Sequence, residues 1–160
     1  MKPAQSAPKM TLTSPAFAEG QTLARSCTGD AGNVSPALRW STSPEGTKAF
    51  AVICRDTDAP SGTFIHWVIY NIPETTRSLP QGIVRAEELN DGAVQGKNDF
   101  GGVGYDGPKP PPGSVHRYFF DLYALDTMLP VEPGIDAARL KQLMNGHILA
   151  TAELVGTYRR

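Results

Sequence analysis

The chain has 160 residues and a formal net charge of −1, with no dense run of lysine and arginine. This length predicts one domain spanning residues 1–160, and the charge excludes general nucleic-acid binding, which needs a basic surface to release counterions. Glycine and proline number 16 and 14, and this abundance favours a turn-rich all-β domain over a disordered chain.

The first nine residues are polar and contain two prolines, so we expect a flexible N-terminal arm there. The arm lacks the apolar segment of a signal peptide, and nothing in the chain has the length of a membrane span. The sequence therefore predicts a cytoplasmic protein without integral membrane association. Cys27 and Cys54 match no metal or redox spacing, and we expect both to be buried, reduced thiols.

Short apolar runs separated by turn residues follow the arm. A strand is expected to begin within residues 10–13, and the alternation of polar and apolar residues resumes at residues 38–40. Residues 49–54 form a continuous apolar run that is too short for a helix, which predicts a central strand buried on both faces.

An acidic loop, residues 55–62, comes directly after this strand. Asp56 lies just beyond the strand end, where side chains converge if the domain has a site. Asp58 can contribute to the same site or act only as a turn former that bonds its own backbone. The next strand, residues 64–73, carries His66 near its start, and alternation places this histidine on the face of Val68 and Tyr70. A histidine at such a position is either a hydrogen-bonded core residue or a ligand.

Glycines and prolines punctuate residues 101–115, which predicts a stiff, shaped loop. The loop leads into an aromatic and aliphatic strand that starts at His116. Alternation puts His116 and Tyr118 on one face of that strand and Arg117 on the other. The sequence therefore predicts that an imidazole and a phenol lie side by side at the end of a sheet.

One helix is predicted near residues 136–145. Asp136 is its expected N-cap and Gly146 its stop signal. The residues between them repeat at helical spacing and should face the core: Ala137, Leu140, Leu143 and Met144. A final strand is expected over residues 150–158.

Three motifs occur in a fixed order along the chain: Asp-x-Asp-Ala-Pro at residues 56–60, His-Trp-Val at 66–68, and Gly-Pro-x-Pro-Pro leading to His-Arg-Tyr within 107–118. Together with residues 35–40 and 146–150, they resemble the phosphatidylethanolamine-binding protein family and its bacterial Raf kinase inhibitor-like branch. The resemblance covers nearly all of residues 10–160.

The resemblance implies a β-sandwich of two antiparallel sheets with one or two short helices and a small anion-binding pocket at one end. Carried over by motif position, the ligand-binding residues would be Asp56, His66, His116 and Tyr118, with Gly107 and Pro108 at the rim. The loop-shaping residues would be Asp58, Pro60 and Pro110, with Pro60 after a cis peptide bond. Because Asp56 would repel an anion, we expect it to orient and charge a neighbouring histidine.

These implications favour a non-enzymatic domain that binds a small anionic or phosphorylated ligand and needs no metal or cofactor. A regulatory role through a protein partner such as a kinase is compatible with them, and so is a homodimer. Two alternatives remain. Two histidines and one carboxylate are the elements of a metal-dependent enzyme, and a serine at 61 or 114 beside a histidine could be the nucleophile of a hydrolase.

Overall fold

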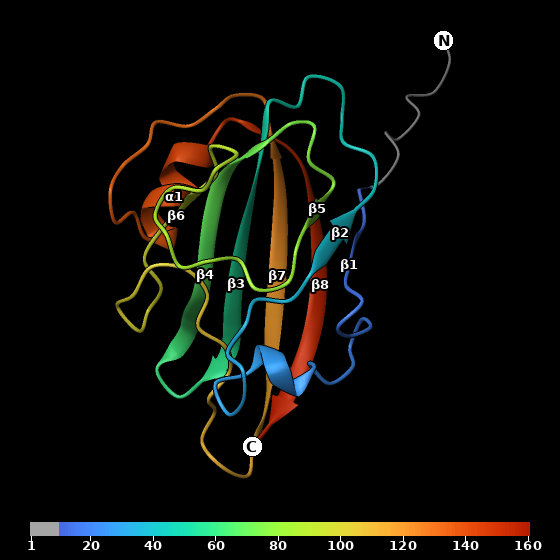
Figure 1. Ribbon diagram of the computed structural model, residues 1–160, viewed down its shortest axis with the longest axis vertical. Helices are drawn as coiled ribbons and strands as arrows, with labels where there is room; N and C mark the ends of the chain where they lie inside the picture. The colour runs from blue at the N-terminus through green and yellow to red at the C-terminus, as the bar shows by residue number, and fades with distance from the viewer. Residues whose placement is uncertain (1–9) are drawn as a thin grey trace.

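The computed structural model describes residues 10–160, and within them two antiparallel sheets pack face to face (Figure 1). The predicted arm, residues 1–9, lies outside the described residues. The strands are β1 (Leu12–Thr13), β2 (Leu38–Trp40), β3 (Ala49–Ala59), β4 (Gly62–Pro73), β5 (Ser78–Leu79), β6 (Val94–Gln95), β7 (Val115–Leu125) and β8 (Ile148–Arg159). The smaller sheet has the order β1-β2-β5 and the larger one β6-β4-β3-β7-β8. This arrangement confirms the predicted all-β sandwich.

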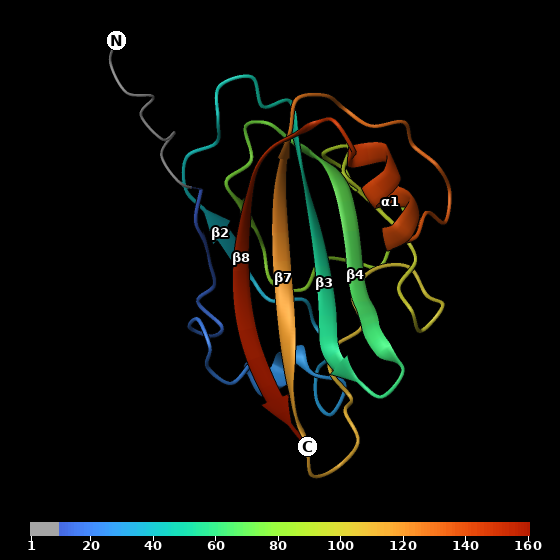
Figure 2. The ribbon, with the colours of Figure 1, turned by 180° about the vertical axis from the view of Figure 1, so that it is seen from behind.

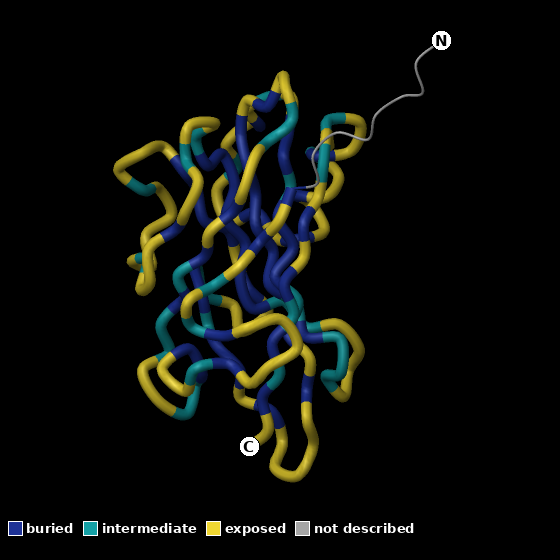
Figure 3. Tube along the Cα trace, turned by 90° about the vertical axis from the view of Figure 1, so that its right-hand side faces the viewer, coloured by how far each residue is buried: buried dark blue, intermediate teal, exposed yellow. Residues whose placement is uncertain are grey.

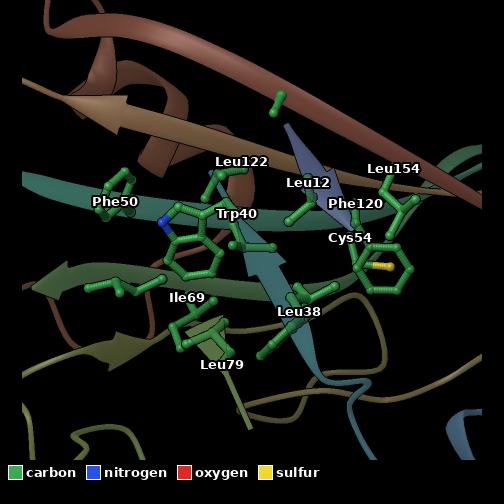
Figure 4. Close-up of a cluster of buried hydrophobic side chains, with 14 of the residues drawn as sticks. Leu12, Leu38, Trp40, Phe50, Cys54, Ile69, Leu79, Phe120, Leu122 and Leu154 are labelled. Atoms are coloured by element: carbon green, nitrogen blue, oxygen red, sulfur yellow. The ribbon is translucent and has the colours of Figure 1, made fainter. Parts of the chain in front are cut away.

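The central strand β3 separates two hydrophobic cores. Its residues Phe50, Val52 and Cys54 face the core between the sheets, where they meet side chains from β2, β4, β7 and β8 (Figure 4). Ala51 and Ile53 point to the opposite face, into a second core. The expected double burial of this strand is confirmed, and Figure 3 shows buried residues running through the centre of the molecule with exposed residues mainly in the surrounding loops.

The second core lies under the helix α1 (Ala137–Met144), which covers one part of the outer face of the larger sheet (Figure 2). Asp136 caps this helix by accepting a hydrogen bond of 2.8 Å from the Arg139 amide. Gly146 has a φ of 83°, a left-handed conformation that suits glycine and ends the helix. The predicted helix and both of its signals are therefore confirmed. A 3₁₀ turn, η1 (Arg25–Cys27), contributes Cys27, which is buried and unpaired like Cys54.

Strand register brings the polar candidates to one end of the sandwich. Asp56 on β3 pairs with Tyr118 on β7, and Tyr118 pairs in turn with Gly156 on β8. The turn between β3 and β4, the start of β7 and the end of β8 therefore lie together (Figures 1 and 2).

A β-bulge in β4 changes the direction of His66. Cys54 pairs with Trp67 and Arg55 with Ile65, so one step along β3 corresponds to two along β4, and His66 is the extra residue. Val68 and Tyr70 belong to the core under α1. Because the bulge interrupts the alternation, His66 leaves their face, contrary to the prediction from strict period-two spacing.

Gly156 on β8 packs closely against Leu23 and Phe17, and a substitution there tests this packing. A Cβ atom added there would lie 2.7 Å from Leu23 Cδ2 and 2.8 Å from Phe17 Cε2. We predict that Gly156→Ala lowers the free energy of unfolding by about 1–3 kcal/mol, the usual cost of overpacking a core. Gly102→Ala is the matched control, because its nearest neighbour would be at an ordinary 3.7 Å. Urea unfolding should give a lower midpoint for the first variant only, and equal midpoints would contradict the packing described.

Candidate functional site

A pocket of about 300 Å³ opens at the end of the sandwich where the β3–β4 turn, the loop before β7 and the start of β7 meet. Its polar lining consists of Asp56, Ser61, His66, Lys109, His116 and Tyr118, and its apolar walls include Phe64, Phe100, Pro60, Pro110 and Pro111. The structure thus brings together all four side chains predicted to contact a ligand. A larger hollow of about 780 Å³ beside β8, which includes Arg55 and Asp121, contains none of them.

Asp56 and His116 form a buried pair in the lining of the pocket. The Asp56 Oδ2 atom lies 2.7 Å from His116 Nδ1, and the two side chains are only 5% and 4% exposed. The other oxygen, Oδ1, accepts a hydrogen bond from the Asp58 amide at 2.7 Å. Because a carboxylate accepts, His116 Nδ1 donates, and Nε2 is the nitrogen left without a partner among residues 10–160. Asp56 therefore orients this imidazole.

His66 is held by a different kind of acceptor. Its Nδ1 atom lies 2.6 Å from the main-chain carbonyl oxygen of Asp106. A carbonyl can only accept, so Nδ1 carries a hydrogen and Nε2 is again the unpartnered nitrogen. Burial lowers the pKa of His66, despite the opposing effects of the Asp106 carbonyl and the Asp56 carboxylate. Asp56 thus does not keep His66 protonated, because the cost of burying an imidazolium outweighs the attraction.

Tyr118 lies between the two imidazoles. Its ring meets that of His66 edge-on at 5.3 Å and stacks with that of His116 at 6.4 Å between centroids. The hydroxyl is buried and has no hydrogen-bond partner among the described residues. Burial, reinforced by the negative charge of Asp56, raises the pKa of Tyr118, so the group stays an O–H donor. An unpaired buried donor of this kind calls for a ligand acceptor.

The rim differs from the expected one. The Gly107 amide donates to Asn33 Oδ1 at 2.6 Å, and the Pro108 carbonyl accepts from the Gly29 amide at 2.8 Å. Both residues are buried behind the pocket and do not line it, because their backbone groups bind the loop near η1. Lys109, Pro110 and Pro111 form the rim instead. Lys109 was missed, although it is the only basic residue among residues 101–115.

The residues expected to shape the acidic loop do so in different ways. Asp58 pairs with Arg117, whose backbone amide and Nε atom both donate to Oδ2, at 2.9 and 3.0 Å. Hydrogen bonds from Arg117 lower the pKa of Asp58. Asp58 therefore fastens the start of β7 and does not line the pocket, while Pro110 does line it.

The predicted cis bond before Pro60 is wrong, because residues 10–160 contain no cis peptide bond. Ala59 pairs with Gly62 across the tight turn, and Gly62 has a φ of 107°. The glycine reverses the chain with the Pro60 bond in trans. Asp56 is aimed by its register opposite Tyr118 instead.

Sequence reasoning also missed the network that fixes the Asp106 carbonyl. The Asp106 carboxylate accepts hydrogen bonds from Asn33 Nδ2 at 3.0 Å and from Asn98 Nδ2 at 2.8 Å, and it pairs with Arg85. Asn33 and Arg85 lie 73 and 21 residues from Asp106 in the sequence, whereas Asn98 lies eight residues before it. Phe100, half-exposed at the mouth, was missed as well, and its place beside two glycines was its only signal.

The two enzymatic alternatives gain no support from this geometry. Within residues 10–160 there is no group of three or more His, Cys, Asp or Glu side chains that could hold a metal ion. Ser61 is exposed at the mouth, and its hydroxyl forms no hydrogen bond to either histidine, while Ser114 lies outside the pocket lining.

The described part of the chain has no helix that combines the length and apolar character needed to cross a membrane.

Comparison with known proteins settles the family. The sequence profile described as phosphatidylethanolamine-binding protein matches residues 13–159. The chain belongs to the phosphatidylethanolamine-binding protein family. A relative from Methanothermobacter thermautotrophicus, named UPF0098 protein, is 48% identical over 151 residues, which cover 94% of this chain and 99% of the relative. The UPF0098 protein YbhB of Escherichia coli is 42% identical over 132 residues, covering 81% and 84%.

Solved structures of family members agree with this assignment. Escherichia coli YbcL, described as a new member of the mammalian PEBP family, has a TM-score of 0.88 and 39% identity, and the match covers 96% of this chain and 99% of YbcL. CT736 from Chlamydia trachomatis, described as a putative phosphatidylethanolamine-binding protein homologue, has a TM-score of 0.87 and 38% identity, with the same coverage. The resemblance stated from the motifs is therefore confirmed.

In this member of the phosphatidylethanolamine-binding protein family, the lowered pKa of His66 makes folding stability depend on pH. Near and below the ordinary value of 6.5, the unfolded chain binds more protons at this histidine than the folded chain does. Stability should therefore fall as the pH drops from 7 to 5.5, by up to about 1.4 kcal/mol per pH unit.

The variant His66→Asn should lose this component, because its amide can still donate to the Asp106 carbonyl but does not titrate. His147→Asn is the control for the loss of a histidine outside the pocket, because His147 is half-exposed and lies at the other end of the sheet. Urea unfolding at several pH values measures both slopes. An unaltered slope in His66→Asn would show that another group is responsible.

Proposed function

We propose that this protein binds a small anionic or phosphorylated group in the pocket and catalyses no reaction on it. The observation that carries the proposal is the buried Tyr118 hydroxyl, a donor that no group among residues 10–160 satisfies. His116 lines the same pocket, and its Nε2 atom, which has no partner among the described residues, can donate to a ligand oxygen when the ring is protonated. Buried polar groups are normally hydrogen-bonded, so a ligand oxygen is the missing partner.

The charges around the pocket support an anion as this ligand. Lys109 stands exposed at the rim and attracts negative charge toward the mouth. Asp56 carries the opposing charge, but its oxygens already accept hydrogen bonds from His116 and from the Asp58 amide. The phenyl rings at 64 and 100 reduce the access of water, which strengthens each hydrogen bond made inside.

The geometry around Ser61, the serine in the pocket lining, is compatible with binding without catalysis. Ser61 lies in the pocket lining but forms no hydrogen bond with a base among the described residues. A phosphorylated protein segment would satisfy the same groups as a free small molecule. A regulatory role through a protein partner such as a kinase is therefore part of the proposal.

Calorimetric titration with methyl phosphate at pH 5.5 tests the proposal. We predict that His116→Ala binds about ten- to a hundredfold more weakly than the parent, because a hydrogen bond to a charged ligand contributes ~1.5–3 kcal/mol. His147→Ala is a matched control. It removes another histidine that is paired with an aspartate at 2.8 Å, at the far end of β7. It should bind like the parent.

Thermal unfolding of each variant establishes that the fold is retained. A parent protein that binds no methyl phosphate would refute the proposal. So would equal weakening in the two alanine variants, because the effect would then not depend on the pocket.

A further inference from the structure

His66 has a feature that simple anion binding does not require, namely an accepting nitrogen in a site for negative ligands. We propose that His66 makes the pocket selective for anions that carry a hydroxyl, such as a singly protonated phosphate group, over sulfate groups of the same shape and charge. This inference rests on the proposed function and specifies its ligand class. His66 would be the residue that determines specificity.

The first step is the fixed position of the ring hydrogen. Nδ1 donates to the Asp106 carbonyl at 2.6 Å, and the Asp106 amide donates back to the His66 carbonyl at 3.1 Å. The Asp106 side chain is itself held by Asn33, Asn98 and Arg85. The backbone amide and the side chain of Asp106 are both hydrogen-bonded, so the Asp106 carbonyl stays in place beside Nδ1. The ring hydrogen therefore stays on Nδ1, and Nε2 presents a lone pair.

The second step is the surroundings of the ring. Phe64 and Phe100 pack against the imidazole, with centroids at 5.2 and 5.6 Å. Charged and titratable groups face it from β3, from the loop before β7 and from β7 itself, namely Asp56, Asp99, Asp106, Lys109, His116 and Tyr118. The aspartates favour a charged ring, but burial has the larger effect and lowers the pKa of His66. The ring is therefore a neutral acceptor at physiological pH.

The third step is the combination of donor and acceptor that a ligand must offer to match Tyr118 and His66. Tyr118 donates to a ligand oxygen, whereas His66 Nε2 must receive a hydrogen from the ligand. A phosphate monoester with one remaining proton offers both an acceptor oxygen and a P–OH donor. A sulfate monoester has no hydroxyl, so one of its oxygens would face the lone pair of Nε2. The nearby Asp56 carboxylate further disfavours a doubly charged ligand.

Methyl phosphate and methyl sulfate form the decisive pair of probes. Near pH 5.5 most methyl phosphate carries one negative charge and one hydroxyl, because its second pKa is about 6. Methyl sulfate has the same charge and nearly the same shape without the hydroxyl. We expect methyl phosphate to bind the parent about ten- to a hundredfold more tightly by calorimetry. At pH 8 this preference should shrink, because methyl phosphate loses its hydroxyl hydrogen.

The variant His66→Asn separates selectivity from binding. It preserves a donor for the Asp106 carbonyl and removes the Nε2 acceptor, so the affinities for the two probes should converge. His116→Ala is the comparison, because it should weaken both anions while the parent's preference for methyl phosphate persists.

The outcomes distinguish this inference from the proposed function. If the parent binds neither probe, both are refuted. If the parent binds both probes equally, or methyl sulfate more tightly, the selectivity is refuted and anion binding stands. If His66→Asn does not fold, the ratio of affinities in the parent and its change between pH 5.5 and 8 decide the matter.

Discussion

The pairing of β3 with β7 is the constraint on which the site depends. It places Asp56 on β3 opposite Tyr118 on β7. The Asp56 Oδ2 atom then lies 2.7 Å from Nδ1 of His116, which comes two residues before Tyr118 on β7. A slip of one residue would turn every side chain of β3 to the other face. It would move Phe50 and Val52 out of the core between the sheets and Ala51 and Ile53 out of the core under α1. The two cores thus keep Asp56 and His116 in register.

The two imidazoles of the pocket donate to acceptors of different kinds. His116 donates to a carboxylate, which carries a full negative charge, while His66 donates to a peptide carbonyl. The same residue type therefore has two different surroundings in one pocket of about 300 Å³, and the proposed function gives the two rings different roles. Neighbours in the structure, and not residue type, decide which role each histidine has.

Much of the framework could be predicted from local sequence patterns. The apolar run at residues 49–54, the cap at Asp136 and the alternation of His116, Arg117 and Tyr118 each depend on spacings of a few residues, and the structure agrees with all three. The motifs identified the family and the four side chains that meet in the pocket. These successes share one cause, because each signal lies within a single segment.

The errors arise where distant segments meet. The bulge at His66 reflects the register between β3 and β4, and periodicity within β4 alone does not reveal it. The prediction of the rim was wrong because the Gly107 amide donates its hydrogen bond to Asn33, more than seventy residues away in the sequence. The cis bond at Pro60 was carried over from the family, although the glycine at 62 lets the turn close in trans.

The attachment of the loop at Gly107 divides it into an anchored part and an exposed part. Gly107 and Pro108 are buried against η1, whereas residues 111–115 are all exposed. Loops tolerate changes in sequence and length where their backbone is solvated. Mutational drift or deliberate engineering can therefore reshape the entrance while the imidazoles and the phenol stay in place. Under the proposed function, the group that the pocket binds and the molecule that carries this group can therefore change separately in evolution.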